Sequence, residues 1–303
     1  NTDLPLSTSY QSNEEIRRLP GGFEDVIRAV SILPGVARVQ AGRNDLIVRG
    51  GAPSENLYLI DNIEVPNINH FGTQGASGGP LSYVNLDFVE GTTFSAGGFG
   101  VQYGDRLSSV LSLDLREGRK DRTGGKATIS ATQFGLNLEG GLSENGSFLL
   151  SARRSYLDLI FKAAGFSFVP EYWDFFGKGS ISIGPKDYLT ILGIGAIDRT
   201  RFFNTNAEQR YDNLRILGSN QNQVVSGLHW RHLFNSGFLT VGLNNAFVQF
   251  DYAQSDSNLQ SVFASHSREN ETSLRGDALV QLSKSVELSF GLQGKLVGLN
   301  SSV

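Results

Sequence analysis

The sequence lacks two residue types altogether, because none of its 303 residues is cysteine or methionine. Without cysteine the chain forms no disulfide, and it offers neither a thiolate nucleophile nor a zinc–cysteine site. The missing cysteine does not by itself identify the cellular compartment. No secretory signal peptide precedes the first predicted element, and position 1 is not methionine. We therefore expect that the numbering starts after processing, or that the chain is a portion of a longer protein.

Long hydrophobic runs and a strong net charge are also absent. No segment approaches the roughly 18 consecutive apolar residues that a membrane-spanning helix requires, and the mean hydropathy is −0.17. This excludes a helical membrane protein but not a β-barrel, whose strands place lipid-facing residues at alternate positions. The formal net charge of −4 gives no support for nucleic acid as a partner.

The few motifs that could carry catalysis lack the structural context that such chemistry needs. Residues 75–79 match Gly-x-Ser-x-Gly, but a polar loop precedes them and Pro80 follows. A nucleophile elbow needs a strand before and a helix after. His229 and His232 lie on one predicted strand, where their spacing places the two rings on opposite faces. The glycines near residue 100 miss the dinucleotide-binding spacing, and no helix follows them. We predict no catalytic residue, no metal site and no cofactor.

Two short helices are predicted in the first part of the chain. Residues 1–12 are polar and have the character of a tether. Asn13, followed by two glutamates, is predicted to cap a first helix, which ends at the Pro-Gly-Gly string at 20–22. The second helix ends before the Leu-Pro-Gly string at 33–35. Its apolar residues at helical spacing are Phe23, Val26, Ile27 and Val30.

Short strands separated by glycine-bearing turns follow over residues 36–61. The stretch 45–67 holds two apolar strands around a Gly-Gly-Ala-Pro turn. A second stretch, 84–118, has the order strand, glycine-rich crossing, strand. In its last strand leucines at 111, 113 and 115 alternate with polar residues, which predicts that one face of this strand is buried.

Several strings in this part resemble the plug domain of TonB-dependent outer-membrane transporters, and the resemblance covers about residues 13–120. The strings are Leu33-Pro34-Gly35-Val36, Arg49-Gly50, Leu59-Ile60-Asp61-Asn62 and Tyr103-Gly104 before the strand 108–115. Asn62 stands where the family usually has glycine. The resemblance implies an α+β plug that blocks the lumen of a barrel.

The loop after Pro66 is long for a compact domain, rich in glycine and without periodicity, which indicates either function or mobility. In a plug it would be an apical loop that faces the extracellular vestibule. The candidate ligand-binding residues are Asn69, His70, Phe71, Thr73 and Gln74. The alternative is a solvated loop with incidental polar groups. The resemblance also implies an ionic latch between plug and barrel wall, for which Arg49 and Glu139 are the candidates.

From residue 123 onward, alternation of apolar and polar residues replaces helical periodicity, except briefly over 157–164. We predict nine strands, near 123–132, 134–142, 147–156, 173–183, 187–200, 221–234, 237–252, 268–282 and 286–299. Several exceed the five or six residues typical of strands in soluble proteins. Their apolar faces would pack on a second sheet in a soluble sandwich and face lipid in an outer-membrane barrel.

Tight turns and long connections alternate along these strands. The tight turns are 144–146, 184–186, 235–237 and 283–285, and the long connections between them are 157–172, 201–220 and 253–267. Since consecutive antiparallel strands place alternate connections at opposite ends, all the tight turns fall at one end. This asymmetry is typical of bacterial outer-membrane barrels. Aromatic clusters at 172–176, 202–203 and 250–252 suit the interfacial girdle of such a barrel.

We therefore predict an N-terminal α+β plug domain over residues 1–122, followed by antiparallel transmembrane β-barrel strands over 123–303. Charged residues just before position 123 mark the boundary. Plugged transporters have about 22 strands, and the nine predicted here do not close such a barrel. We expect the chain to be the N-terminal portion of a larger protein.

The resemblance implies a transporter rather than an enzyme. Its function would be TonB-dependent uptake of a scarce nutrient, by default a siderophore–iron complex, across the outer membrane of a Gram-negative bacterium. The implied partners are the inner-membrane TonB–ExbB–ExbD complex, outer-membrane lipid and a small-molecule or oligomeric ligand. Residues 1–12 contain no recognisable TonB-contact motif. A barrel with a gate domain used for secretion, adhesion or assembly is the first alternative, and a soluble β-rich binding protein is the second.

One string distinguishes branches of that family. Arg106-Leu107-Ser108-Ser109-Val110 departs from the asparagine-glycine-valine string of the glycan-importing SusC-like branch. We therefore predict no lipoprotein lid of the kind that this branch carries. The closing segment of the plug is similar to another Bacteroidota-type branch, whose substrates the sequence does not reveal.

Overall fold

The computed structural model describes residues 7–20, 25–38, 43–75, 78–100, 102–130 and 133–303. They form two compact units, and the chain passes from the first to the second between Glu117 and Gly118. The sequence-based boundary between residues 122 and 123 lies a few residues further along and stays a prediction. No helix among the described residues is both long enough and apolar enough to cross a membrane.

The first unit is built on a five-stranded mixed sheet with the strand order β1-β8-β9-β4-β5. The strands are β1 (Thr8–Ser12), β4 (Asn56–Ile60), β5 (Ile63–Val65), β8 (Val89–Ser95) and β9 (Ser109–Leu115). β4 and β9 run parallel, and the other neighbours pair antiparallel. Leu111 and Leu113 of β9 are buried, which confirms the buried face that alternation predicts for this strand.

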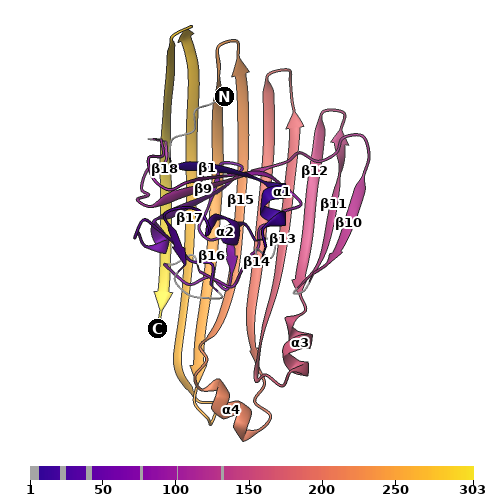
Figure 1. Ribbon diagram of the computed structural model, residues 1–303, viewed down its shortest axis with the longest axis vertical. Helices are drawn as coiled ribbons and strands as arrows, with labels where there is room; N and C mark the ends of the chain where they lie inside the picture. The colour runs from indigo at the N-terminus through magenta and orange to yellow at the C-terminus, as the bar shows by residue number, and fades with distance from the viewer. Residues whose placement is uncertain (1–6, 21–24, 39–42, 76–77, 101, 131–132) are drawn as a thin grey trace. The chain divides into compact units, whose positions relative to one another are not determined.

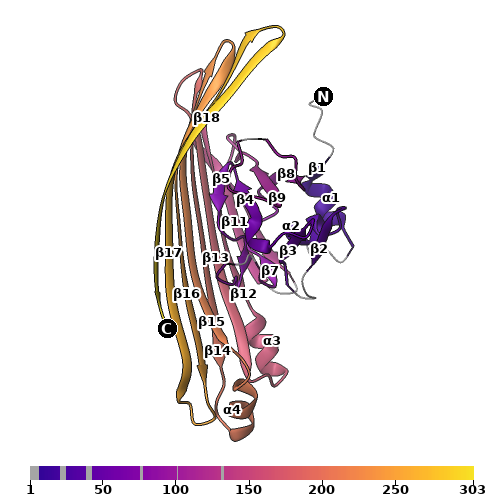
Figure 2. The same cartoon turned by 90° about the vertical axis from the view of Figure 1, so that its left-hand side faces the viewer.

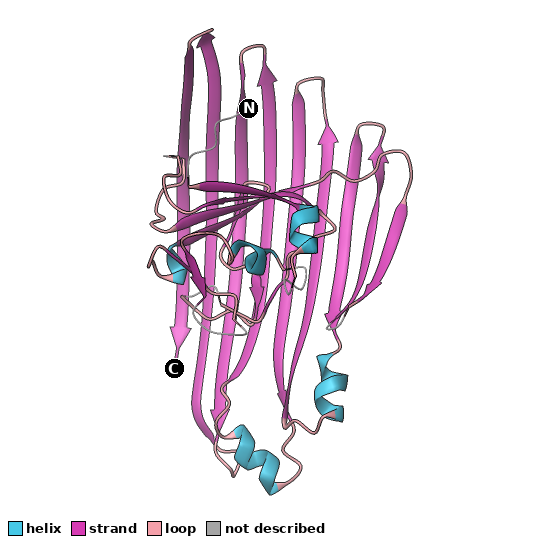
Figure 3. Cartoon of the chain, in the orientation of Figure 1, coloured by secondary structure: helices cyan, strands magenta, loops and turns pink. Residues whose placement is uncertain are grey.

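Smaller elements complete the first unit. Two-stranded sheets form between β2 (Val36–Arg38) and β3 (Leu46–Val48), and between β6 (Asn69–His70) and β7 (Leu81–Ser82). A single 3-10 turn, η1 (Pro53–Glu55), leads into β4. The two predicted helices are present as α1 (Asn13–Arg18) and α2 (Val26–Val30), drawn in cyan in Figure 3.

The first helix begins one residue earlier than its sequence indicates. The predicted cap, Asn13, is already helical, and the N-cap is Ser12, whose hydroxyl accepts from the backbone N–H of Glu15. Ser12 and Glu15 form a capping box. Tertiary contacts favour Ser12 as the cap, because the Asn13 side chain donates to the carbonyls of Leu86 and Val89. In the second helix Asp25 is the N-cap, whereas the predicted Phe23 lies outside the described residues.

The turn between β4 and β5 explains why Asn62 can replace glycine. Asp61 and Asn62 have φ angles of 48° and 65°, the conformation of a two-residue type I′ hairpin turn. Asparagine and aspartate tolerate this left-handed region better than other side chains. The turn is also tied to β9, because the Asp61 carboxylate accepts from the backbone N–H of Leu115 at 2.8 Å.

The second unit is one sheet of nine strands in sequence order, seen side by side in Figure 1. The strands are β10 (Gly124–Ile129), β11 (Gln133–Ser143), β12 (Gly146–Ser155), β13 (Phe168–Ser182), β14 (Asp187–Phe202), β15 (Gly218–Phe234), β16 (Gly237–Ser255), β17 (Ser261–Ser283) and β18 (Val286–Ser302). Pairing is antiparallel from β10 to β17. Figure 2 shows this sheet from the side and its curvature.

The alternation of tight and long connections is confirmed for the long connections 156–167 and 203–217, whereas the third, 256–260, has only five residues. The tight turns lie together at the upper end of the sheet in Figure 1, and the helices α3 (Leu157–Ala163) and α4 (Ala207–Asn213) lie in connections at the lower end. The strands reach further into these connections than alternation predicts, since β13, β15 and β17 begin at Phe168, Gly218 and Ser261. Backbone pairing with the neighbouring strand continues there although these residues show no regular apolar alternation.

The continuous register assigns each strand residue to one of two faces. We call the face that carries Phe134, Leu150, Val224 and Leu243 the exposed face, because these side chains are exposed. Trp173 and Phe175 both lie on this exposed face, as an interfacial girdle requires. Their rings are stacked on each other. The predicted girdle pair Phe250 and Tyr252 lies on the opposite face, so that interpretation was wrong for it.

Candidate functional site

Buried hydrogen bonds hold both ends of the segment 66–83, which contains the predicted ligand loop. At its start, Asn67 donates its side-chain amide to the carbonyl of Asn69 and accepts from the N–H of Asn69, both at 3.0 Å. At its end, the Tyr83 hydroxyl donates to the carbonyl of Asn67. The Tyr83 N–H bonds the carbonyl of Ile68 at 3.0 Å. These bonds close the segment at its base.

A buried aspartate joins this segment to the second helix. Asp25 is 3% exposed, and its carboxylate accepts from two backbone N–H groups at the start of α2. The other carboxylate oxygen accepts from the side chain of Asn44 at 2.8 Å and from the N–H of Ser82 at 2.9 Å. Asn44 also donates to the side-chain oxygen of Asn69 at 3.2 Å. Three sequence segments therefore meet at one carboxylate, and Asn44 extends the network to the start of the loop at Asn69.

A second contact reaches further along the loop. Arg43 pairs with Asp45 at 2.7 Å and donates to the Thr73 hydroxyl at 3.1 Å. Asp45 is buried. The arginine therefore links an exposed loop residue to a buried carboxylate in the body of the unit.

The five predicted ligand-binding residues do not share one environment. Asn69 and His70 are 0% and 1% exposed, and the His70 ring packs edge-on against Tyr83. These two side chains form the base of the loop in this conformation. Thr73 is exposed, whereas Phe71 and Gln74 are partly exposed. Phe71 also has a left-handed backbone, with φ of 54°. Phe71, Thr73 and Gln74 are thus the candidates with accessible side chains, and ligand binding by the loop stays a prediction.

Two adjacent glycines let the loop close on its base. A Cβ atom on Gly79 would lie 2.0 Å from the carbonyl oxygen of His70, and one on Gly78 would lie 2.1 Å from the side chains of Arg43 and Asp45. The neighbour of Gly79 is backbone, which cannot move without opening the β6–β7 pair. Glycine is therefore required at position 79 by close approach.

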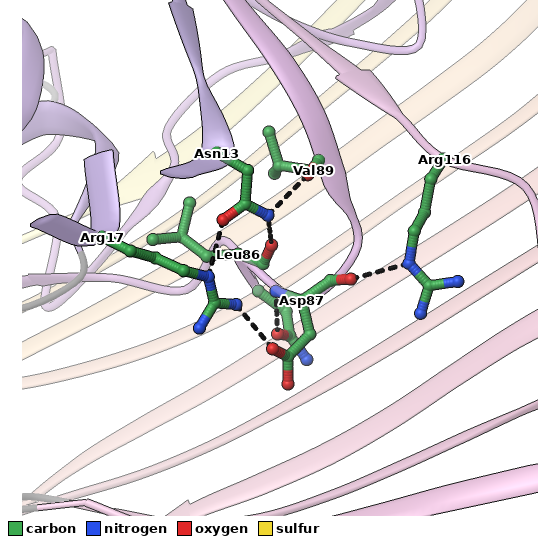
Figure 4. A network of polar contacts seen from close by, with 7 residues as sticks. Asn13, Arg17, Leu86, Asp87, Val89 and Arg116 are labelled. Carbon is green, nitrogen blue, oxygen red and sulfur yellow. Dashed lines mark hydrogen bonds and ion pairs between the residues drawn. The ribbon is translucent and has the colours of Figure 1, made fainter. Parts of the chain in front are cut away.

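A separate polar network ties the first helix to the turn before β8 (Figure 4). Asn13 donates to the carbonyls of Leu86 and Val89. Arg17 donates to the Asn13 side chain at 2.6 Å and pairs with the Asp87 carboxylate at 2.5 Å. These bonds dock the helix onto the sheet, and we call the network the α1 clasp.

The α1 clasp also reaches the first residue after β9. Arg116 donates to the backbone carbonyl of Asp87 at 2.8 Å, and its guanidinium lies 5.6 Å from the centre of the Phe88 ring. The single turn around Asp87 therefore holds both the first helix and the segment through which the chain leaves the unit.

Glu15 is the titratable group of α1 whose pKa departs from its ordinary value. The backbone N–H and the hydroxyl of Ser12 donate to its carboxylate and lower the pKa. Because the folded pKa lies below the unfolded one, the capping box stabilises the helix above the unfolded pKa. That contribution is lost as the pH falls through the folded pKa.

The two candidate latch residues lie in different units and are described separately. Arg49 is exposed, has a left-handed backbone with φ of 50°, and donates its N–H to the carbonyl of Gly35 at 2.9 Å. Glu139 pairs with Arg119 at 3.4 Å. An ionic latch between Arg49 and Glu139 stays a prediction.

The histidines are placed as their spacing predicts. His229 contacts Asn244, whereas His232 contacts Asp187 at 2.8 Å on the other face of the sheet. Among the described residues, no group of three or more histidine, aspartate or glutamate side chains is arranged to hold a metal ion.

Sequence reasoning missed the residues that organise both networks. Asp25 precedes an apolar helical run, which is the signal of an N-cap, but nothing local indicates its bonds to Asn44 and Ser82. Asp87 lies in a polar turn, and its two arginine partners are distant in sequence. Such long-range polar contacts have no periodic signature.

We expect Gly79→Ala to loosen the ligand loop, because its new methyl group displaces the His70 carbonyl and opens the β6–β7 pair. Overpacking of this kind costs about 1–3 kcal/mol. Amide hydrogen exchange over residues 66–83 should become faster. Gly75→Ala is the control, since Gly75 has a left-handed φ of 72° but open space around its Cβ position. Equal exchange in both variants would contradict a role for close approach.

We expect Arg17→Gln to release α1, because it removes the ion pair with the partly buried Asp87. The side chains of this pair are 25% and 18% exposed, and the loss should be about 1 kcal/mol. Hydrogen exchange should accelerate over residues 8–19. Arg18→Gln in the same helix breaks an ion pair that is 82% and 72% exposed, so it should change nothing. A matching acceleration in Arg18→Gln would refute the clasp.

Comparison with known proteins identifies the first part of the chain. The sequence model described as TonB-dependent Receptor Plug Domain matches residues 1–109. A search of curated protein sequences gives no significant match.

Solved receptors share the fold along nearly the whole chain. A ferric enterobactin receptor mutant, PfeA G324V from Pseudomonas aeruginosa, is 16% identical with a TM-score of 0.73, covering 98% of this chain and 50% of that one. The siderophore receptor PirA from Pseudomonas aeruginosa is 16% identical with a TM-score of 0.70, covering 99% and 49%. The copper transporter OprC is 13% identical with a TM-score of 0.70, covering 98% and 46%.

The chain thus spans about half the length of these solved structures. At such low identity the structural matches show the fold, which is a plug followed by antiparallel strands of a barrel. The family model identifies residues 1–109 as a plug domain of the TonB-dependent receptors, a family of receptors and transporters rather than enzymes.

Proposed function

We propose that this chain forms the plug and the first wall strands of an outer-membrane receptor that imports a scarce nutrient with energy supplied through TonB. One observation carries the proposal: a plug-family domain is followed directly by a nine-stranded sheet that has its tight turns at one end and its two longest connections, 156–167 and 203–217, at the other. That asymmetry is typical of barrels whose long loops face the outside. The plug would gate the lumen.

The ligand we propose is a ferric siderophore. PirA and PfeA are a siderophore receptor and a ferric enterobactin receptor, and OprC is a copper transporter. Copper in its reduced state prefers the sulfur ligands of cysteine and methionine, and this sequence contains neither. A siderophore needs no such ligands, because it encloses the metal itself and presents an organic surface. This portion of the receptor therefore favours a chelated metal over a bare copper ion.

The ligand loop would act as the sensor of the plug. Phe71 offers an apolar surface, and Thr73 and Gln74 offer hydrogen-bonding groups to an organic ligand. A ligand that displaces Thr73 from Arg43 would act on the buried Asp45, and through the base of the loop on Asp25 and α2. These contacts form a continuous path from the loop to the body of the unit.

We expect full-length receptor carrying this chain to restore accumulation of a radiolabelled ferric siderophore in Gram-negative cells that lack their own siderophore receptors. Hydroxamate and catecholate complexes are supplied separately. Accumulation should be lost in cells without TonB, because transport against a gradient needs coupled energy. A Phe71→Ala/Gln74→Ala variant should bind the transported complex more weakly, and Glu144→Ala at a tight turn is the control. Equal accumulation without TonB would instead favour the secretion, adhesion or assembly alternative.

We expect Arg49→Glu to increase leakage of small solutes, if Arg49 latches the plug to a carboxylate such as Glu139. Reversing the charge replaces attraction by repulsion. Leakage is measured as the swelling rate of liposomes that contain the receptor. Combining Arg49→Glu with Glu139→Arg should restore the seal. Unchanged leakage in the single variant would rule the latch out.

A further inference from the structure

Arginines gather at one end of the exposed face of the sheet. Among the described residues of β10 to β17, the register places Arg154, Arg199, Arg201 and Arg268 on this face. All four lie toward the ends of their strands near the long connections. The other arginines and lysines of these strands lie on the opposite face, and the tight turns carry Lys186 and Lys284. The exposed face is thus cationic at one end.

Two of these arginines pair with one carboxylate, and a third is its register partner on the adjacent strand. Glu171 lies 3.6 Å from the guanidinium of Arg154 and 2.8 Å from that of Arg201. Arg199 is the register partner of Glu171 on the adjacent strand. The side chain of Glu171 is 11% exposed, whereas those of Arg154 and Arg201 are 35% and 66% exposed. Glu171 offsets one of the charges of Arg154 and Arg201, so this pair carries one positive charge in excess, on side chains that are more exposed than that of Glu171. Arg199 also interacts electrostatically with Asp251 of the same face.

The arginines differ in what they can offer a ligand. Arg199 donates to two backbone carbonyls and to the Asn222 side chain, so its geometry is set by the sheet. Arg201 projects furthest into the surroundings. Arg154 lies over the Trp173 ring at 5.5 Å, which fixes its guanidinium beside an aromatic surface. Arg154 and Arg201 share the single carboxylate of Glu171, so the pair can attract a second anion.

Apolar residues continue directly from the cluster along the exposed face. Trp173 and Phe175 stack with ring centres 6.1 Å apart. Ile197 and Val224 follow on the adjacent strands, and both are exposed. A molecule that fits this surface has an anionic head for the arginines and hydrocarbon for the residues below. Phosphate suits arginine best, because the planar guanidinium donates two parallel hydrogen bonds to it.

We propose that Arg154 and Arg201, with Trp173 and Phe175, bind the phosphorylated headgroup and the adjoining acyl chain of a glycolipid of the outer leaflet. The inference rests on the proposed function, since it takes the exposed face to contact lipid and the long connections to face outward. Glu171 bridges the two guanidinium groups, and the phosphate neutralises their remaining charge. The site would fix the receptor within the lipid layer on this side of the barrel.

The test compares the lipid that stays bound to full-length receptor purified from outer membranes in a non-ionic detergent. Native mass spectrometry identifies each bound lipid, and a phosphate assay measures its amount. The Arg154→Gln/Arg201→Gln variant should retain several-fold less phosphorylated glycolipid than the unmodified receptor. Lys186→Gln/Lys284→Gln removes two cations at the opposite end of the sheet and should retain the normal amount. Glu171→Gln removes the competing carboxylate and should retain more.

Two controls separate the possible failures. Outer-membrane fractionation and a heat-dependent shift on a gel show whether each variant is inserted and folded. Absence of the unmodified receptor from the outer membrane would contradict the proposed function itself. An inserted double arginine variant with undiminished glycolipid would overturn the lipid site alone. So would an equal loss from the lysine control, or a loss of phospholipid instead of glycolipid.

Discussion

The antiparallel backbone ladder from β10 to β17 is the constraint on which the second unit depends. A chain that crosses lipid must satisfy its backbone polar groups internally, and the ladder does so across neighbouring strands. The same register assigns each strand side chain to one of the two faces of the sheet. Arg153 therefore pairs with Asp174 on one face at 2.7 Å, whereas the next residue, Arg154, lies over Trp173 on the other. A slip of one residue would exchange these two environments.

The first unit depends on buried polar anchors instead of a ladder alone. Asp25 and Asn44 join α2 to both ends of the ligand loop, and Asp87 joins α1 to the end of β9. Buried hydrogen-bond networks are stable when every member is satisfied, and they weaken sharply when one bond is lost. A domain held in this way has few alternative arrangements, which suits a gate that must be closed by default and open on a defined signal.

The distribution of charged side chains over the sheet also follows from the register of the backbone ladder. On the exposed face, arginines occupy one end, and apolar and aromatic side chains continue from them. The opposite face carries buried polar groups such as Asp198 and Gln221. Strand residues alternate between the two faces, so a single strand supplies residues to the pattern of each face. The residues of either face are therefore not consecutive in the sequence. The arginine cluster around Glu171 comes from three strands, which is why no local motif announces it.

The sequence by itself determined the element types, the plug resemblance and the alternation of tight and long connections, because these follow from local periodicity and turn chemistry. Only the tertiary structure decided that Ser12 caps α1. The Asn13 side chain instead donates to the carbonyls of Leu86 and Val89, which are distant in sequence. The tertiary structure likewise placed Asn69 and His70 inside the base of the loop. Strand lengths exceeded their apolar patterns because backbone pairing with a neighbour continues where side chains carry no signal.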